Sequence, residues 1–173
     1  MMAFPSDEFL MTAFTKGDRT SFDRLVSRYS STLDAYFRRR LPDDGRAEEL
    51  RQETLLAIYS LAPSYQAKGR FRSLLFSIAY RKLVSARRAE KPTEPVTERL
   101  EAPREHPDSL PIRAALRDLS EPLREALMLK YFEGLTSAEA GEVLGCSAEA
   151  VRARACRARS ALARRLDETR RTR

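Results

Sequence analysis

The chain has 173 residues, which is enough for one domain or for two small ones. Apolar residues make up 42 % and charged residues 33 % of it, too apolar for a wholly disordered chain and too polar for a membrane protein. The sequence shows neither a run long enough to span a bilayer nor the basic start and apolar stretch of a signal peptide, so we expect a cytoplasmic protein.

The net charge of +7 is concentrated in two basic segments. Residues 68–91 have a net charge of +7 and residues 148–173 a net charge of +6, so the rest of the chain sums to −6. One basic segment is often only a solvated helix face. Two compact ones favour a polyanionic partner, with nucleic acid as the first candidate.

The residues that build enzyme active sites are sparse. His106 is the single histidine and lies among prolines, while Cys146 and Cys156 have neither a CxxC motif nor a nearby histidine. These residues assemble neither a zinc site nor a nucleophile–base pair, and no glycine-rich phosphate loop is present. We therefore predict a protein without catalysis, metal or cofactor.

Residues 6–91 are predicted to form the first of two helical domains. Helices are expected over residues 7–15, from a cap at Asp18 or Thr20 to residue 40, over residues 46–60 and over residues 71–88. Residues 41–45 form a turn, and residues 61–69 form a loop that contains Pro63 and Gly69. The side chains expected inside are Phe22, Leu25, Val26, Tyr29, Leu33, Tyr36, Phe37, Leu50, Leu55, Ile58, Leu74, Leu75, Ile78 and Leu83.

Residues 92–111 are predicted to be a flexible acidic linker. They hold five of the nine prolines and five acidic residues, with few large apolar groups to bury. Within it, residues 97–102 are compatible with a short helical stretch. The linker separates residues 6–91 from residues 112–169.

Residues 112–169 are predicted to form the second helical domain. Short helices are expected over residues 112–119 and 137–144, a helix begins after Ser120 and ends at Glu133-Gly134, and a long helix covers residues 148–169. Ser120 and Ser147 are expected caps, and Thr136 with Glu139 forms a capping box. No segment alternates like a strand, so the predicted fold is all-α.

The last two predicted helices have the pattern of a helix-turn-helix. The turn is Gly145-Cys146-Ser147, and small residues on both helices allow a close approach. The second helix turns Val151, Ala155, Leu162 and Leu166 inward, which leaves its arginines outside. Arginine reads guanine with a bidentate fork and also grips phosphates. A plain helical hairpin with a solvated arginine face is the alternative.

Several strings together resemble the extracytoplasmic-function (ECF) group of the sigma-70 family. In the second domain they are residues 116–125, 131–135, 138–139, 142–145 and 151–159. In the first domain they are Gly17-Asp18 with Phe22, Leu25 and Tyr29, then residues 47–54, then residues 71–79 with the basic run 81–88. The resemblance covers about residues 7–169 in the family's order. It implies an alternative sigma factor that binds core RNA polymerase and directs it to promoters in response to a stress or envelope signal.

The resemblance also assigns partners and sites. The first, sigma-2-like domain would dock on the clamp helices of the largest polymerase subunit, and the factor would also meet the polymerase flap. Its docking residues would be Glu49, Leu50, Gln52 and Glu53. An anti-sigma protein is a further expected partner, which would hold the factor inactive and could keep it at the membrane without any insertion of the chain.

The same domain would recognise and melt the minus-ten promoter element. Aromatic rings can stack on unpaired bases and cations can follow the phosphates. The residues expected there are Tyr65, Lys68, Arg70, Phe71, Arg72, Arg81, Lys82, Arg87 and Arg88. Phe71 as a plain core residue is the alternative. Leu74 stands where the family usually has a tryptophan, and we expect it to fill core space.

The sigma-4-like second domain would read the minus-thirty-five element. The residues expected there are Ser147, Arg152, Ala153, Arg154, Cys156 and Arg157, with Arg152 and Cys156 facing the groove floor. Ala153 and Cys156 depart from the family pattern, which leaves the element's sequence open. The rival interpretations are a stand-alone helix-turn-helix regulator of duplex DNA and, more distantly, an RNA-binding helical protein. The stand-alone regulator would not explain residues 49–53 or the second basic segment.

Overall fold

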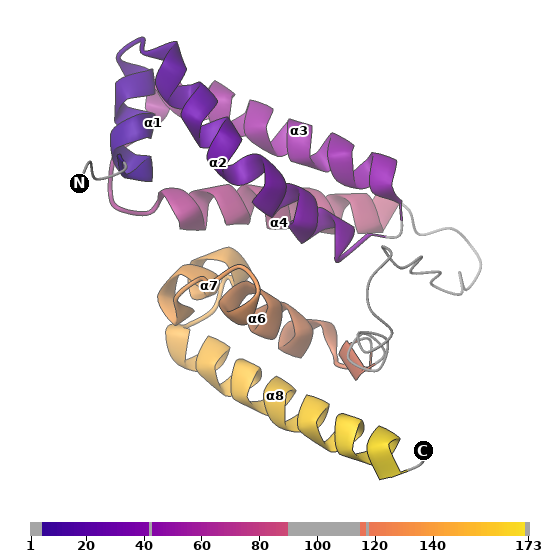
Figure 1. Cartoon of the computed structure of the whole chain (residues 1–173). Helices are drawn as coiled ribbons and strands as arrows, with labels where there is room; N and C mark the ends of the chain where they lie inside the picture. The colour runs from indigo at the N-terminus through magenta and orange to yellow at the C-terminus, as the bar shows by residue number, and fades with distance from the viewer. Residues whose placement is uncertain (1–4, 42, 90–114, 117, 172–173) are drawn as a thin grey trace. The chain divides into compact units, whose positions relative to one another are not determined.

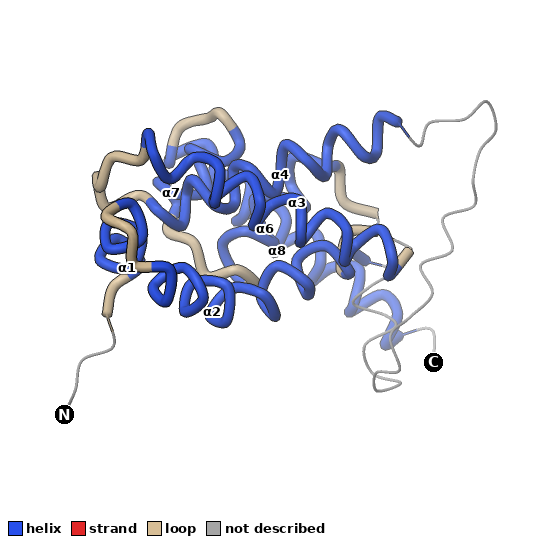
Figure 2. The backbone as a smooth tube through the Cα atoms, turned by 90° about the horizontal axis from the view of Figure 1, so that it is seen from above, coloured by secondary structure: helices blue, strands red, loops and turns tan. Residues whose placement is uncertain are grey.

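The computed structural model describes residues 5–41, 43–89, 115–116 and 118–171 (Figure 1). Within these ranges the backbone forms helices joined by loops and contains no strand (Figure 2). The all-α prediction is therefore confirmed. The chain divides into two compact units, residues 1–100 and residues 101–173, and each is described here by itself. The predicted linker over residues 92–111, with His106, lies outside the described residues.

The first unit is a bundle of helices. Its elements are α1 (Asp7–Thr15), α2 (Arg19–Arg38), α3 (Asp44–Leu61), a 3₁₀ helix (Ala62–Ser64) and α4 (Phe71–Ala89). Helix α2 packs against α1 and α3, α3 packs against α4, and α1 also meets the 3₁₀ helix and α4. The large side chains that fill the core are Leu10, Met11, Leu25, Leu33, Tyr36, Phe37, Leu50, Ile58, Leu75, Phe76 and Leu83.

Helix starts in this unit are fixed by side-chain caps. Ser6 accepts a hydrogen bond from the Phe9 amide, and Asp18, rather than Thr20, caps α2. The Asp43 carboxylate accepts from the Gly45 amide at 2.8 Å, so α3 begins two residues before the predicted start. Gly45 therefore lies inside a helix and not in the predicted turn.

Four side chains expected inside are only partly buried: Phe22, Val26, Leu55 and Leu74. Phe22 joins Phe14 and Tyr59 in a ring cluster near the surface, with ring centroids 4.7–5.2 Å apart. These rings tie α1, α2 and α3 together without being enclosed. The prediction for Leu74 was thus too simple, because part of its side chain remains accessible.

The second unit consists of α6 (Glu121–Tyr131), α7 (Ser137–Leu144) and α8 (Ala148–Arg171). Helix α8 packs along both α6 and α7, which also touch each other. Leu119, Leu127 and Ala158 form a core cluster, with Leu116, Leu123, Ala161 and Leu162 packed against it. Of the predicted inward stripe on α8, Val151 and Ala155 are buried, whereas Leu162 and Leu166 are partly covered.

The ends of these helices confirm most of the predicted signals. Thr136 and Glu139 form the capping box, Gly145 ends α7 at φ +64°, and the Ser147 hydroxyl accepts from the Ala150 amide at 3.1 Å. Two details differ. The Ser120 side chain makes no capping hydrogen bond, and only its backbone carbonyl accepts from the Leu123 and Arg124 amides. Helix α6 ends at Tyr131, two residues before Glu133, but Gly134 takes the predicted left-handed conformation after the helix, at φ +65°, and the Leu135 amide donates to the Leu129 carbonyl there.

Candidate partner and nucleic-acid interfaces

Helix α7 approaches the turn that joins it to α8 closely at Gly141. The Cys146 amide donates to the Gly141 carbonyl at 3.0 Å. A Cβ atom at residue 141 would lie 2.6 Å from the Cys146 carbonyl oxygen, closer than real Cβ contacts allow. Gly141 therefore lets the turn close tightly, and the turn sets the direction in which α8 leaves it.

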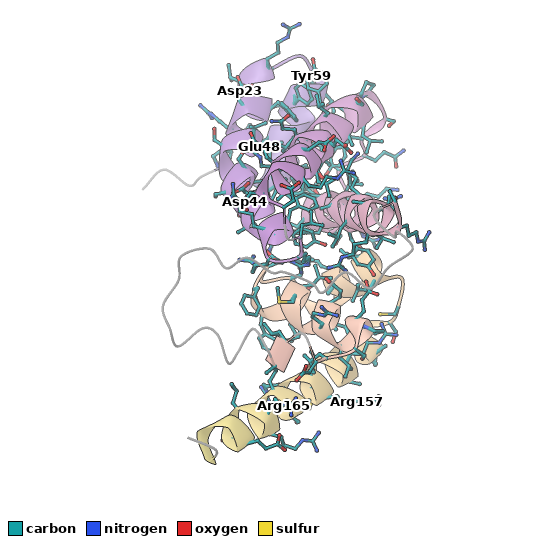
Figure 3. The ribbon with its side chains drawn as sticks, turned by 90° about the vertical axis from the view of Figure 1, so that its right-hand side faces the viewer. Asp23, Asp44, Glu48, Tyr59, Arg157 and Arg165 are labelled. Carbon is teal, nitrogen blue, oxygen red and sulfur yellow. The ribbon has the colours of Figure 1, made fainter. Side chains whose placement is uncertain are left out.

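The first turns of α8 have a buried side and an exposed side, as a helix that enters a DNA groove requires. Val151, Ala155 and Ala158 are buried, while Arg152, Ala153, Cys156 and Arg157 are exposed, as is the Ser147 cap. Arg152 and Cys156 lie one helical turn apart and so share a face. Figure 3 labels Arg157 and Arg165 on α8. Arg165 forms an ion pair with Asp118 at 2.7 Å.

Two of the arginines predicted to contact DNA already bind other side chains of the same unit. Arg154 is half-buried and donates to the Cys146 Sγ at 3.4 Å, so its guanidinium reaches back to the turn. Arg152 pairs with Glu149 at 2.5 Å, and both side chains remain largely exposed. The helix-start backbone N–H of Glu149 and the Arg152 guanidinium hold the pKa of the Glu149 carboxyl below its usual value. Sequence analysis missed Glu149, although its i, i+3 spacing from Arg152 was visible.

The cations predicted for the minus-ten element fall into two groups. Lys68, Arg70, Arg81 and Arg88 are exposed, and Arg72, Lys82 and Arg87 are partly buried. Of the second group, Lys82 pairs with Glu53 at 2.8 Å, and Arg87 donates to the Arg40 carbonyl at 3.2 Å. The exposed group lies at the surface, where phosphates can approach it.

Phe71 is a core residue, which corrects the prediction that it stacks on a base. Its side chain is 3 % exposed, and its ring lies 5.7 Å from the Tyr29 ring and 6.4 Å from the Tyr65 ring, centroid to centroid. Tyr65 keeps part of its ring accessible. The aromatic side chain available to a base in this loop is therefore Tyr65.

A carboxylate from α1 holds this loop. Glu8 accepts the Tyr65 hydroxyl at 2.6 Å and the Phe71 amide at 2.9 Å. Burial, followed by the bond to Glu8, raises the pKa of Tyr65 above its ordinary value, so the hydroxyl stays a donor. Sequence analysis treated Asp7 and Glu8 as part of a short first helix and assigned them no role, because nothing local indicates a partner some sixty residues away.

The predicted polymerase-docking residues on α3 differ in how far they are exposed. Glu49 and Gln52 are exposed, and Glu53 is partly buried beside Lys82. Leu50 is 1 % exposed and packs in the core, so its prediction as a contact residue is wrong for this conformation. The helical period places Leu50 with Ala47, Thr54 and Ile58 on the buried side.

The same exposed side of α3 continues with two apolar residues that sequence analysis did not select. Leu56 is 65 % exposed and Tyr59 48 % exposed. Residues 49, 52, 56 and 59 are spaced by three or four and so lie on one helix face. Figure 3 labels Glu48 and Tyr59 on this unit. The Glu48 carboxylate accepts from the side-chain Nε2 of Gln52 and from the Arg51 guanidinium, both at 3.3 Å.

Comparison with known families explains the two units together. Residues 25–93 match the family described as sigma-70 region 2, and residues 109–162 match sigma-70, region 4. The RNA polymerase sigma-H factor of Pseudomonas aeruginosa is 30 % identical over 182 residues, covering 94 % of each chain. The ECF RNA polymerase sigma factor SigC of Mycobacterium tuberculosis is 30 % identical over 177 residues, again covering 94 % of each. The chain belongs to the ECF sigma factors of the sigma-70 family.

Two solved structures share the fold of this sigma factor. CnrH in complex with the cytosolic domain of CnrY has a TM-score of 0.74, 24 % identity and coverage of 94 % of this chain and 97 % of that one. RpoE of Bartonella quintana, in complex with the anti-sigma factor NepR, has a TM-score of 0.69, also at 24 % identity, covering 84 % and 96 %. The fold of both units therefore occurs in known sigma factors.

Membership of the family confirms the predicted function of a sigma factor, with core RNA polymerase and promoter DNA as its partners. This sigma factor binds core RNA polymerase and promoter DNA and directs transcription initiation. The stand-alone regulator and the RNA-binding protein are set aside, because the relatives match over both units. Among the described helices, none is long and apolar enough to cross a membrane. Within the same residues, no group of His, Cys, Asp and Glu could hold a metal ion.

Proposed function

We propose that the two units of this sigma factor bind different parts of the promoter complex. Residues 6–91 would bind core polymerase and the minus-ten element, and residues 112–169 would bind the minus-thirty-five element, with residues 92–111 as a linker. The observation that carries the proposal is the exposed start of α8, where Arg152 and Cys156 share one face behind the glycine-dependent turn.

For polymerase, the proposed docking face is the exposed side of α3. Glu49, Gln52 and Glu53 offer acceptors to cations of the clamp helices, and Leu56 and Tyr59 add accessible apolar surface beside them. Apolar anchors with a polar rim are the usual composition of a protein–protein interface. Leu50 supports this face from inside the unit and makes no direct contact.

For the minus-ten element, the proposed surface is the loop before α4 together with the start of that helix. Tyr65 would stack on an unpaired base, while Lys68, Arg70 and Arg72 would follow the phosphates. Further along α4, Arg81, Lys82, Arg87 and Arg88 would extend the cationic track.

For the minus-thirty-five element, Arg152 is proposed to read a base edge together with Cys156 and Ala153. Arg157 would bind a flanking phosphate, and Arg154, held at the turn by Cys146, would support the turn and reach the backbone beside it. The factor would act without catalysis of its own, in the cytoplasm, where core polymerase works.

Regulation by an anti-sigma protein is also proposed. CnrH and Bartonella quintana RpoE were each solved with a partner, CnrY and the anti-sigma factor NepR. The exposed apolar residues Leu56 and Tyr59 give this chain surface that such a partner could cover in competition with polymerase. The inducing signal would then act by releasing the factor.

Transcription from a random promoter library tests the assignment of the units. Holoenzyme reconstituted from core polymerase and the full chain should select two sequence blocks upstream of the transcripts. Arg152→Ala should change the upstream block alone, and Lys68→Ala with Arg70→Ala should weaken selection of the block nearer the start. Absence of selected blocks, or a change in the wrong block, would overturn the assignment.

A further inference from the structure

The loop that precedes α4 is fastened at both ends to one carboxylate. Glu8 Oε2 accepts the Tyr65 hydroxyl at 2.6 Å, and Glu8 Oε1 accepts the Phe71 amide at 2.9 Å. Between these two residues lie the exposed Lys68 and Arg70, and Gly69 at φ +68°. We refer to Glu8, Tyr65 and Phe71 as the loop anchor.

The hydrogen bond from the Phe71 amide to the Glu8 carboxylate acts as a helix cap. Phe71 is the first residue of α4, whose leading amides have no partner within the helix. A carboxylate at that end is favoured by the helix dipole. Glu8 comes from α1, so the cap also ties the start of α4 to a helix 63 residues earlier in the chain.

The residue before Glu8 holds a second tyrosine ring behind the loop. Asp7 accepts the Tyr29 hydroxyl and pairs with Arg28, both on α2. The Tyr29 and Tyr65 rings both pack against Phe71. Two consecutive acids of α1 thus fix two tyrosines around one buried phenylalanine, and this leaves Tyr65 little freedom to turn.

We propose that Glu8 is a positioning residue for promoter recognition, which holds the Tyr65 ring and the Lys68–Arg70 segment in the arrangement that binds single-stranded minus-ten DNA. The proposal rests on the role given above to this loop. Glu8 itself does not touch DNA; its effect is to remove the cost of ordering the loop at the moment of binding.

Charge and positioning predict opposite results for Glu8→Ala. A carboxylate near the loop repels DNA phosphates, so its removal alone should tighten binding. Loss of the anchor should instead loosen the loop and weaken binding. Glu8→Gln removes the same charge, yet its amide oxygen can accept from Phe71 and its NH₂ group can donate to the Tyr65 oxygen.

Binding of reconstituted holoenzyme to DNA with a pre-opened minus-ten region separates the two effects. We expect Glu8→Ala to bind about tenfold more weakly than Glu8→Gln, with reduced discrimination between minus-ten sequences. Tyr65→Phe, which keeps the ring and loses the hydroxyl bond, should fall between them. Affinity for core polymerase and for the duplex minus-thirty-five element should stay unchanged.

A matched control accounts for lost stability. Asp18→Ala removes the cap of α2 at an exposed site away from the loop and should leave minus-ten discrimination intact. Equal binding by Glu8→Ala and Glu8→Gln, while wild type discriminates, would overturn this inference alone. Failure of wild-type holoenzyme to discriminate minus-ten sequences would overturn the proposed role of the loop and this inference with it.

Discussion

Lys82 on α4 donates to Glu53 on α3 at 2.8 Å, and the pair joins two surfaces proposed for different partners. Glu53 belongs to the proposed polymerase face and Lys82 to the proposed DNA track. Both side chains are partly exposed, so the pair is worth at most about 1 kcal/mol. Either partner could therefore take over its residue at small cost, and polymerase bound at Glu53 would leave Lys82 available to a phosphate.

The docking face can be tested without damage to the fold. Gln52→Ala with Glu53→Ala removes two side chains whose partners, Glu48 and Lys82, lie at the surface, so we expect the unfolding free energy to fall by no more than about 1 kcal/mol. Affinity for core polymerase should fall about tenfold or more, because interface hot spots cost at least about 2 kcal/mol each. Competition with a labelled sigma factor for core polymerase measures this.

Leu50→Ala is the contrasting variant. It opens a cavity in the core, and we expect it to lower the unfolding free energy by about 2–5 kcal/mol. Its remaining folded fraction should bind core polymerase with wild-type affinity. Equal competition by the Gln52→Ala, Glu53→Ala variant and wild type would show that polymerase docks elsewhere.

The turn between α7 and α8 provides a second prediction. Gly141→Ala places a methyl group 2.6 Å from the Cys146 carbonyl oxygen, so the turn must open. We expect a loss of about 1–3 kcal/mol in stability of the second unit and weaker duplex binding. Denaturant unfolding of the full chain, together with binding to the upstream promoter element, measures both effects.

Gly45→Ala is the matched control in the other unit. Its Cβ would lie 3.3 Å from the Asp43 carboxylate, a side chain that can move, and alanine favours the helix by up to about 1 kcal/mol. Stability within about 1 kcal/mol of wild type is expected. If Gly141→Ala proves equally harmless, the close approach of turn and helix is not required.

The helices and their ends could be predicted from the sequence because their signals are local. Asp18, Ser147 and the box of Thr136 with Glu139 each act within three residues. Leu50 fitted two patterns at once, the helical period of the core and the docking motif. The period predicted its burial correctly, and the motif did not. The helical period predicts which side chains are buried, whereas a motif predicts only the region of the chain in which a function lies.

The loop anchor could not be predicted in the same way. Glu8 reaches residues 57 and 63 positions away, and such a contact depends on how α1 packs against α4. Phe71 illustrates the same limit: its basic neighbours suggested a DNA-facing ring, but Tyr29 and Tyr65 enclose it. The partners of an isolated charge or ring are set by tertiary structure.

Alkaline pH should weaken the first unit through two tyrosines. Burial and the carboxylates of Asp7 and Glu8 raise the pKa of Tyr29 and of Tyr65 above the ordinary value of 10.0. The native state then binds these protons more tightly than the unfolded state, so their contribution is complete below about pH 10 and is lost as pH rises further. Denaturant midpoints from about pH 9 to pH 11 should fall with pH.

The double variant Tyr29→Phe with Tyr65→Phe isolates that contribution. It should be less stable near neutral pH, because two hydrogen bonds are lost, yet its midpoint should fall less steeply above about pH 10. Tyrosinate absorbance in wild type should appear for these two residues only as the protein unfolds. A double variant whose midpoint falls as steeply as that of wild type would rule out this source of alkaline sensitivity.

The recognition helix gives the sharpest prediction, because Arg152 and Glu149 form an ion pair at its exposed start and carry charges that act in opposite directions on DNA. Arg152→Ala should cost about 1–3 kcal/mol of promoter binding and relax the preference at one base pair. Glu149→Gln should release Arg152 and remove a charge that repels phosphates. All DNA sequences should then bind more tightly and be discriminated less well. The slope of log binding constant against log salt concentration should become steeper by up to about one.

Arg164→Ala is the control for Arg152→Ala, since it removes an exposed arginine of the same helix about 18 Å further from the turn. It should leave the base preference unchanged. Binding to the promoter element and its single-base variants at two salt concentrations decides between the roles of Arg152. A base-reading arginine changes the ranking of sequences. If Arg152→Ala instead weakens all of them alike and lowers the salt slope by about one, Arg152 binds only phosphate, and the specificity of this helix must come from Ala153, Cys156 and Glu149.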